Sequence, residues 1–144
     1  MSEYILSESA LTELCHTLKN TIRKGYVVLL RGDLGSGKTT LVRSFVAFES
    51  KEQANEVTSP TFSLAQAYKS QDYGAIYHYD IYRKDMQDML ELGLLEMLEQ
   101  DGLHFVEWGD EALENILRQN GFNVMSITIN TNAMLDHRIY KVAL

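Results

Sequence analysis

The chain is poor in cysteine, proline and positive charge, and each shortage excludes a class of protein. A single cysteine, Cys15, permits no intramolecular disulfide, which excludes a disulfide-stapled scaffold and leaves a buried, inert thiol as the expectation. A single proline, Pro60, leaves no proline-rich linker that would divide the chain. No apolar run approaches the roughly 20 residues that span a bilayer, and the first residues lack a signal-peptide pattern. We therefore expect a soluble, cytoplasmic protein without membrane contacts.

The charge balance argues against a free-standing nucleic-acid-binding module. The 144 residues include 13 Lys and Arg against 20 Asp and Glu, a formal net charge of −7. Modules that bind DNA or RNA draw much of their affinity from neutralising phosphates, which requires positive charge. At this length, and with 45% hydrophobic residues, we expect one domain, residues 1–144, with a core of ordinary size.

Helical and strand patterns alternate along the chain, which predicts an α/β fold: a mixed β-sheet flanked by helices on both sides. The expected strands are Tyr4–Leu6, Tyr26–Leu30, Phe62–Tyr68, Ala75–Tyr82, Leu103–Val106, Asn123–Asn130 and Arg138–Leu144, with a hairpin turn at Gln71–Gly74. One expected helix carries Leu11, Leu14, Leu18 and Ile22 between an N-cap at Ser7 or Ser9 and a stop at Gly25, and a second carries Leu41, Val42, Phe45 and Val46. Two more helices are expected at Asp85–Glu99, broken at Gly93, and at Asp110–Gln119, with Ala112, Leu113, Ile116 and Leu117 inward; Glu49–Glu56 is expected to be a polar loop.

Residues 32–39 read Gly-Asp-Leu-Gly-Ser-Gly-Lys-Thr, which is the phosphate-binding loop pattern G-x-x-x-x-G-K-[ST]. The preceding strand and the following amphipathic helix supply the setting that this motif requires, so we expect a P-loop NTPase-like fold. The glycines let backbone N–H groups converge on phosphate oxygens. Lys38 supplies a point charge for the β- and γ-phosphates, and Thr39 offers a hydroxyl to Mg²⁺. No guanine-specifying Asn-Lys-x-Asp motif is present, which favours ATP over GTP.

Two acids are candidates for the chemistry beside this loop. Glu107 ends the expected strand Leu103–Val106, where P-loop proteins carry the acid that holds the magnesium water shell; the alternative is an ordinary surface carboxylate. Asp80 lies in an aromatic-rich strand, where an acid is costly unless it is paired or solvated. It is a candidate for orienting or deprotonating the attacking water, and the alternative is a salt bridge with Arg83. His78 is expected to be a packed or surface histidine.

Two further segments have an open role. The hydroxyls of residues 57–62, including Thr61, precede a strand and are candidates for sensing the γ-phosphate; the alternative is a plain turn. Trp108 is the only tryptophan of the chain. It is a candidate for capping the site or stacking on a partner, and the alternative is core packing.

Five segments, in this order and spacing, resemble the TsaE (YjeE) family of small bacterial P-loop ATPases. They are Gly32–Thr40, Ser59–Leu64, His78–Arg83, Glu91–Gly93 and Val106–Trp108, and the resemblance extends from about residue 4 to residue 130. The chain departs from the common family pattern at Tyr79, where phenylalanine or leucine is usual, and at Gly109, where proline is frequent. Neither departure removes a catalytic group.

The resemblance implies an ATP- and Mg²⁺-dependent ATPase that is an accessory subunit of the TsaB–TsaD machinery for threonylcarbamoyladenosine at position 37 of tRNA. ATP hydrolysis would reset the complex between turnovers, and tRNA would be reached only through TsaD and TsaB. The implied phosphate-binding residues are Gly35, Ser36, Gly37, Lys38, Thr39 and Thr40; the implied catalytic residues are Asp80, Glu107 and Lys38; the implied magnesium ligands are Thr39 and Glu107; and Thr61 and Trp108 are switch or partner-facing candidates. Two alternatives stay open: a nucleotide-dependent binding module with negligible hydrolysis, and a small-molecule P-loop kinase, although no arginine-bearing lid is recognisable.

Overall fold

The computed structural model describes residues 1–57, 65–131 and 134–144. Helices and strands alternate along most of this chain, as the sequence predicts. In chain order the elements are β1 (Ser2–Ser7), the 3-10 helix η1 (Glu8–Ala10), α1 (Leu11–Thr21), β2 (Val27–Arg31), α2 (Lys38–Glu49), α3 (Lys51–Ala54), β3 (Ala65–Ser70), β4 (Gly74–Asp80), α4 (Met86–Glu91), α5 (Leu94–Leu98), β5 (Leu103–Glu107), α6 (Glu111–Gln119), β6 (Val124–Asn130) and β7 (His137–Ala143).

The described strands join one mixed sheet in the order β1-β7-β6-β2-β5-β4-β3. Strand β2 lies at the centre, parallel to β6 on one side and to β5 on the other, and β4 is parallel to β5. Strands β1, β7 and β3 pair antiparallel with their neighbours, and β3 and β4 form the predicted hairpin. The parallel strands β2, β5 and β4 therefore end at the same edge of the sheet, and open α/β sheets bind ligands at the carboxyl ends of their parallel strands.

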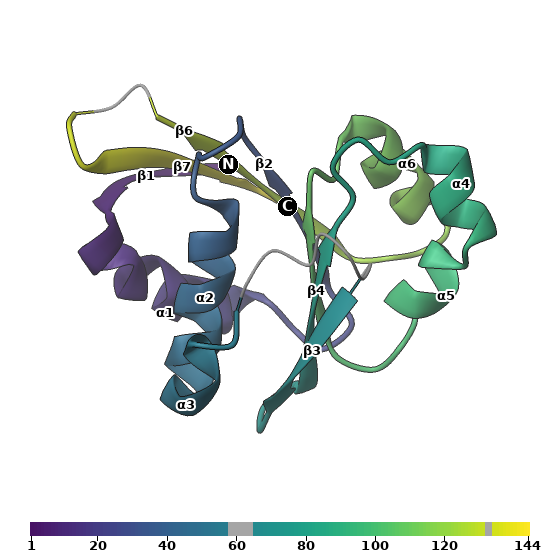
Figure 1. The fold of residues 1–144 in the computed structure, drawn as a ribbon, viewed down its shortest axis with the longest axis horizontal. Helices are drawn as coiled ribbons and strands as arrows, with labels where there is room; N and C mark the ends of the chain where they lie inside the picture. Colours follow the sequence, from purple (N-terminus) through teal and green to yellow (C-terminus); the bar gives the residue numbers. More distant parts are fainter. Residues whose placement is uncertain (58–64, 132–133) are drawn as a thin grey trace.

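Helices cover both faces of the sheet, with α1, α2 and α3 on one side and α4, α5 and α6 on the other (Figure 1). The central strand β2 contributes side chains to the hydrophobic core on each face of the sheet, because successive side chains of a strand point to opposite faces. Val28 and Leu30 pack into the core beneath α1 and α2, whereas Val27 and Leu29 pack into the core beneath α4, α5 and α6. The predicted α/β class, with a mixed sheet flanked by helices, is confirmed.

Cys15 lies fully buried in the core beneath α1. Burial raises the pKa of its thiol to about 12, because the thiolate would lose its hydration. The expectation that this thiol is buried is confirmed. No helix among the described residues combines the length and the apolar composition needed to cross a membrane.

The predicted polar loop at Glu49–Glu56 is wrong in part, because Lys51–Ala54 forms the short helix α3. The side-chain amide of Gln53 explains why this polar segment is ordered. Its Nε2 donates to the carbonyl of Lys69 at 2.7 Å, and its Oε1 accepts from the N–H of Lys69 at 2.8 Å. The amide thus pairs with backbone of the edge strand β3 as a neighbouring strand would.

Helix boundaries differ from the prediction at α1. Neither Ser7 nor Ser9 caps it: η1 intervenes, and the two hydroxyl oxygens lie 3.0 Å apart in a hydrogen bond with each other. The helix ends before Gly25, because Ile22 is already extended.

Two other helix predictions have different outcomes. Ala112 of α6 is exposed rather than inward, whereas Leu113 and Leu117 form its buried stripe. The predicted break at Gly93 is confirmed, since a φ of 94° ends α4 and starts α5. Of the expected strand Phe62–Tyr68, residues 62–64 lie outside the described part.

Candidate functional site

The phosphate-binding loop connects β2 to α2, as the sequence motif requires. Gly37 adopts a φ of 110° immediately before α2, a conformation that glycine tolerates and other residues rarely adopt. Gly32 is closely packed: a Cβ there would stand 2.7 Å from the carbonyl oxygen of Ile129. The first amides of α2 have no partner within the helix, so this helix start attracts anions. The loop is therefore built as a phosphate cradle.

Lys38 is the positive charge of the cradle and is largely buried. Its ammonium donates to the carbonyl of Gly32 at 2.7 Å and to that of Asp33 at 2.9 Å. Burial lowers the pKa of Lys38, and the nearby carboxylates of Glu107, Asp80 and Asp33 oppose that shift. The lysine is thus held among acceptors that a phosphate oxygen could replace.

Asp80 and Glu107 are paired neighbours on the adjacent parallel strands β4 and β5. Both carboxylates are buried, with Asp80 9% and Glu107 3% exposed. The hydroxyl of Thr39, in the first turn of α2, donates to Oε2 of Glu107 at 2.7 Å. Glu107 is therefore not the ordinary surface carboxylate that the sequence left open.

His78 meets the same carboxylate from β4. Its Nε2 lies 2.5 Å from Oε2 of Glu107, and the imidazole is fully buried. Sequence reasoning treated His78 as packed or exposed and missed this contact. The available signal was the alternation of the strand: His78 and Asp80 are two residues apart and so lie on the same face.

Asp80 shapes the turn that follows β4. Its Oδ1 accepts the backbone N–H of Tyr82 at 2.9 Å, which fixes the carboxylate at the end of the strand. The guanidinium of Arg83 stands 5.1 Å from the ring centroid of Tyr82.

Trp108 covers the loop lysine. Its ring centroid lies 4.0 Å from the ammonium of Lys38 and 4.5 Å from the ring centroid of Tyr82. The residue is half-buried: it packs against the core beneath α4, α5 and α6 and also forms part of the wall of the site, so the core-packing alternative holds in part. Contacts between a cation and an indole face are favourable, and they strengthen when water is excluded.

Two cavities adjoin the loop and share Gly37 and Thr40. One, of about 350 Å³, is lined by Leu34, Gly35, Gly37, Lys38, Thr39, Thr40, Asp80, Tyr82, Glu107 and Trp108. The other, of about 360 Å³, is lined by Ser7, Glu8, Ser9, Ser36, Gly37, Thr40, Asp136, Arg138 and Tyr140. Most of the predicted site residues thus line the first cavity, whereas Ser36 lines the second. Thr61 falls outside the described residues.

The second cavity contains residues that the sequence did not indicate. Arg138 of β7 reaches across to the loop, where its Nε donates to the carbonyl of Ser36 at 3.1 Å. The two residues are far apart along the chain, and only the pairing of β7 with β6 and β1 brings Arg138 to the loop. No local signal in the sequence identifies this arginine.

The donor set beside the loop has the chemistry of a magnesium site. Within the described residues, no cluster of three or more His, Cys, Asp or Glu side chains could hold a metal ion. Mg²⁺ commonly uses one or two carboxylates, a hydroxyl, waters and substrate phosphates instead of an all-protein cage. Thr39 with Glu107, and Asp80 next to them, fit that pattern.

Comparison with known proteins identifies the family. The family model described as "Threonylcarbamoyl adenosine biosynthesis protein TsaE" matches residues 5–139. The chain belongs to the TsaE family. The proteins named "tRNA threonylcarbamoyladenosine biosynthesis protein TsaE" from Rickettsia conorii and Rickettsia bellii are 38% and 37% identical over 77% of this chain. A Haemophilus influenzae protein of the same name is 34% identical over 66% of the chain.

The matched part differs in extent between these TsaE proteins. It spans 62% of the Rickettsia conorii protein, 75% of the Rickettsia bellii protein and 59% of the Haemophilus influenzae protein. The crystal structure of Bacillus subtilis YdiB superposes with a TM-score of 0.61 at 24% identity, over 96% of this chain and 82% of that one. This likeness supports the fold.

Proposed function

We propose that residues 1–144 form one P-loop ATPase domain that binds ATP with Mg²⁺ and hydrolyses it. The observation that carries the proposal is that the loop lies beside two buried acids. Thr39 donates a hydrogen bond to Glu107, and Asp80 on β4 is the residue paired with Glu107 on β5. A nucleoside triphosphate with magnesium needs this combination of convergent amides, one lysine, a hydroxyl and a carboxylate. ATP is favoured over GTP because the chain carries no guanine-specifying motif.

The residues of the site have distinct parts in this proposal. The amides of Gly35, Ser36, Gly37, Lys38, Thr39 and Thr40 bind phosphate oxygens. Lys38 exchanges its loop carbonyls for β- and γ-phosphate oxygens and offsets their charge. Thr39 and Glu107 would hold a magnesium ion with its waters, and bound magnesium would supply positive charge that offsets the charge of the phosphates.

Asp80 is proposed to act on the attacking water. Its carboxylate orients the water and accepts a proton as the water oxygen bonds to the γ-phosphorus, while the bond from that phosphorus to the β,γ-bridging oxygen breaks. The products are ADP and inorganic phosphate. The support is its position: Asp80 and Glu107 line the same cavity as Lys38 and Thr39.

The second cavity is proposed to hold the nucleoside. It shares Gly37 and Thr40 with the cavity of the acids, so one nucleotide can lie across the start of α2. Its lining includes Arg138, whose guanidinium is a planar cation; Tyr140, also in the lining, is buried. A guanidinium can stack on the planar base of a nucleotide.

The biological role proposed is that of an ATPase subunit in threonylcarbamoyladenosine synthesis on tRNA, in the cytoplasm. Family membership supports it. TsaB and TsaD are the proposed partners, and hydrolysis would reset their complex between turnovers. The net charge of −7 favours a protein that contacts tRNA only through these partners.

The test is phosphate release from ATP, measured with the chain alone and with TsaB and TsaD added. We expect slow release alone and faster release with the partners, since a partner can supply charge to the transition state. Lys38→Ala should stay at background in both arms, and Lys84→Ala, which changes an exposed lysine, should behave as wild type. Background release by wild type in both arms favours the binding module, and phosphate transfer to a small-molecule acceptor favours the kinase.

A further inference from the structure

The turn after β5 has an unusual backbone. Trp108 adopts a φ of 69°, in the left-handed region that bulky residues seldom occupy. The backbone N–H of Trp108 donates to the carbonyl of Leu30 at 2.8 Å. This conformation turns the indole toward the loop, where the ring covers the ammonium of Lys38 at 4.0 Å. Something must hold the turn, because strained backbone persists only where its surroundings over-determine it.

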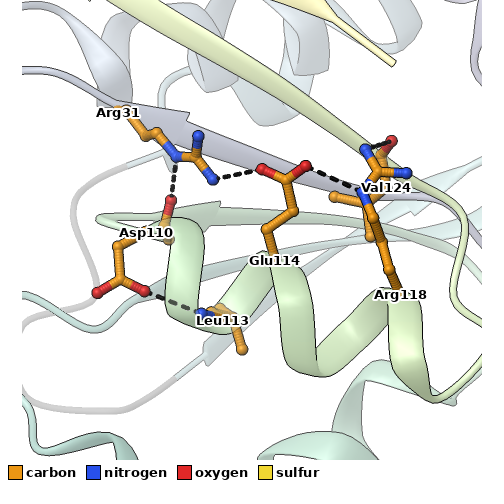
Figure 2. A network of polar contacts seen from close by, with 7 residues as sticks. Arg31, Asp110, Leu113, Glu114, Arg118 and Val124 are labelled. Atoms are coloured by element: carbon orange, nitrogen blue, oxygen red, sulfur yellow. Dashed lines mark hydrogen bonds and ion pairs between the residues drawn. The ribbon is translucent and has the colours of Figure 1, made fainter.

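Arg31 contacts the turn from the last position of β2. Its Nε donates to the carbonyl of Gly109, the residue after Trp108, at 2.7 Å. A second nitrogen of the same guanidinium donates to Oε1 of Glu114 on α6, also at 2.7 Å (Figure 2). The planar fork of arginine serves both acceptors at once, and a lysine in its place could not match that geometry.

Glu114 is itself held by a second arginine. Arg118, one turn further along α6, donates to Oε2 of Glu114 at 2.9 Å and to the carbonyl of Val124 at 3.2 Å (Figure 2). The carboxylate therefore stands between two guanidinium groups, one toward the turn and one toward the start of β6. At the other end, the side chain of Asp110 caps α6 by accepting from the N–H of Leu113 at 2.9 Å.

We propose that Arg31 is a positioning residue that holds the Trp108 turn so that the indole stays over Lys38. Arg31 acts by positioning Trp108 and not by contacting a nucleotide itself. Because the indole forms one wall of the cavity that contains Lys38, Asp80 and Glu107, loss of the turn changes the shape of that cavity. The effect on ATP rests on the proposed function, whereas the effect on Trp108 does not.

The first test uses Trp108 itself, which is the only tryptophan and so reports alone in fluorescence. Arg31→Met keeps the aliphatic stem and removes both hydrogen bonds. In the folded variant, checked by circular dichroism, we expect a shifted emission maximum and an acrylamide quenching constant raised about twofold, as the ring leaves the contact with Lys38. Arg31→Lys should change both in the same direction. Wild-type emission and quenching in folded Arg31→Met, or in Arg31→Lys if Arg31→Met does not fold, would overturn the proposal.

The matched control is Arg118→Met. It removes the other partner of Glu114 and leaves the bond to Gly109 in place, so Trp108 should keep its wild-type emission and quenching. An equal change in both variants would mean that α6 as a whole, rather than the Arg31 contact, determines the position of the ring, and would also overturn the proposal.

A second arm connects the turn to the nucleotide. Titration with Mg-ATP should give a Kd about threefold higher for Arg31→Met than for wild type, the effect expected when one cation–π contact is lost. If wild type itself binds no ATP, the proposed function fails, yet the fluorescence comparison still decides the role of Arg31.

Discussion

The hydroxyl of Thr39 donates a hydrogen bond to Oε2 of Glu107 at 2.7 Å. The bond joins the first turn of α2 to the last residue of β5, and the two bonded residues are 68 positions apart in the sequence. The same oxygen meets Nε2 of His78, so the carboxylate is fixed from two sides. In the proposed function, an acid held in this way would orient magnesium waters without first reorganising.

His78 should matter for stability through that contact. His78→Ala leaves the buried Glu107 with fewer partners, and we expect the free energy of unfolding to fall by about 1–3 kcal/mol. His78→Gln should recover part of the loss, because its amide can donate from nearly the position of Nε2. Urea denaturation of the three proteins gives the values. Equal stability of the Ala and Gln variants would show that the hydrogen bond contributes nothing beyond packing.

Glu107→Gln should weaken nucleotide binding only where magnesium takes part. The amide keeps the size of the side chain and removes the charge that holds the ion, so we expect Kd for ATP to rise about tenfold in Mg²⁺. In EDTA the Kd should match that of wild type. Glu111→Gln, at an exposed position of α6, is the control. A magnesium titration identical to that of wild type would contradict the assignment of Glu107.

Asp80→Asn should separate binding from hydrolysis. The amide oxygen can still accept the N–H of Tyr82, so the turn should survive and the Kd for Mg-ATP should stay within about twofold. Without the carboxylate we expect turnover to fall about 100-fold, a typical cost for a lost general base. The exposed Asp101→Asn is the matched control. Turnover at the wild-type rate would make Asp80 a structural residue.

The stability of the chain should depend on pH through Glu114. Burial raises the pKa of this carboxyl, but hydrogen bonds from Arg31 and Arg118 outweigh that effect, so the pKa lies below its ordinary value of 4.5. A folded-state pKa below the unfolded value stabilises above about pH 4.5, and the benefit disappears as pH falls through the folded value.

Glu114→Gln should accordingly lower the free energy of unfolding at neutral pH by about 1 kcal/mol, since the pair is partly exposed. The difference from wild type should shrink as pH falls below about 4.5 and through the lowered folded-state pKa of Glu114, where this side chain becomes neutral, as glutamine is at every pH. Thermal denaturation across this range measures it. A difference that stays constant with pH would exclude the ion pair as its origin.

The sequence predicted those parts of the site that are local in the chain. The loop 32–39 has its own signature, and the apolar run ending at Leu30 is typical of a central strand buried on both faces. Glu107 was found because it ends such a strand. These patterns depend on a few adjacent residues, so a single sequence carries them.

Contacts between distant segments could not be predicted in the same way. The bond from Arg31 to Glu114 joins positions 83 residues apart, and its partners are set by where α6 packs. Arg138 reaches Ser36 only because β7 pairs with β6 and β1. His78 could be placed on the face of Asp80 by alternation, but its contact with Glu107 depends on β4 lying beside β5.

Calorimetric titration of the chain with Mg-ATP tests the central claim most directly, because it asks whether the loop and its two acids bind the nucleotide. We expect one saturable site in wild type and in Lys84→Ala, and no measurable binding in Lys38→Ala that retains its fold. Absence of binding in wild type, or equal binding in Lys38→Ala, would contradict the account.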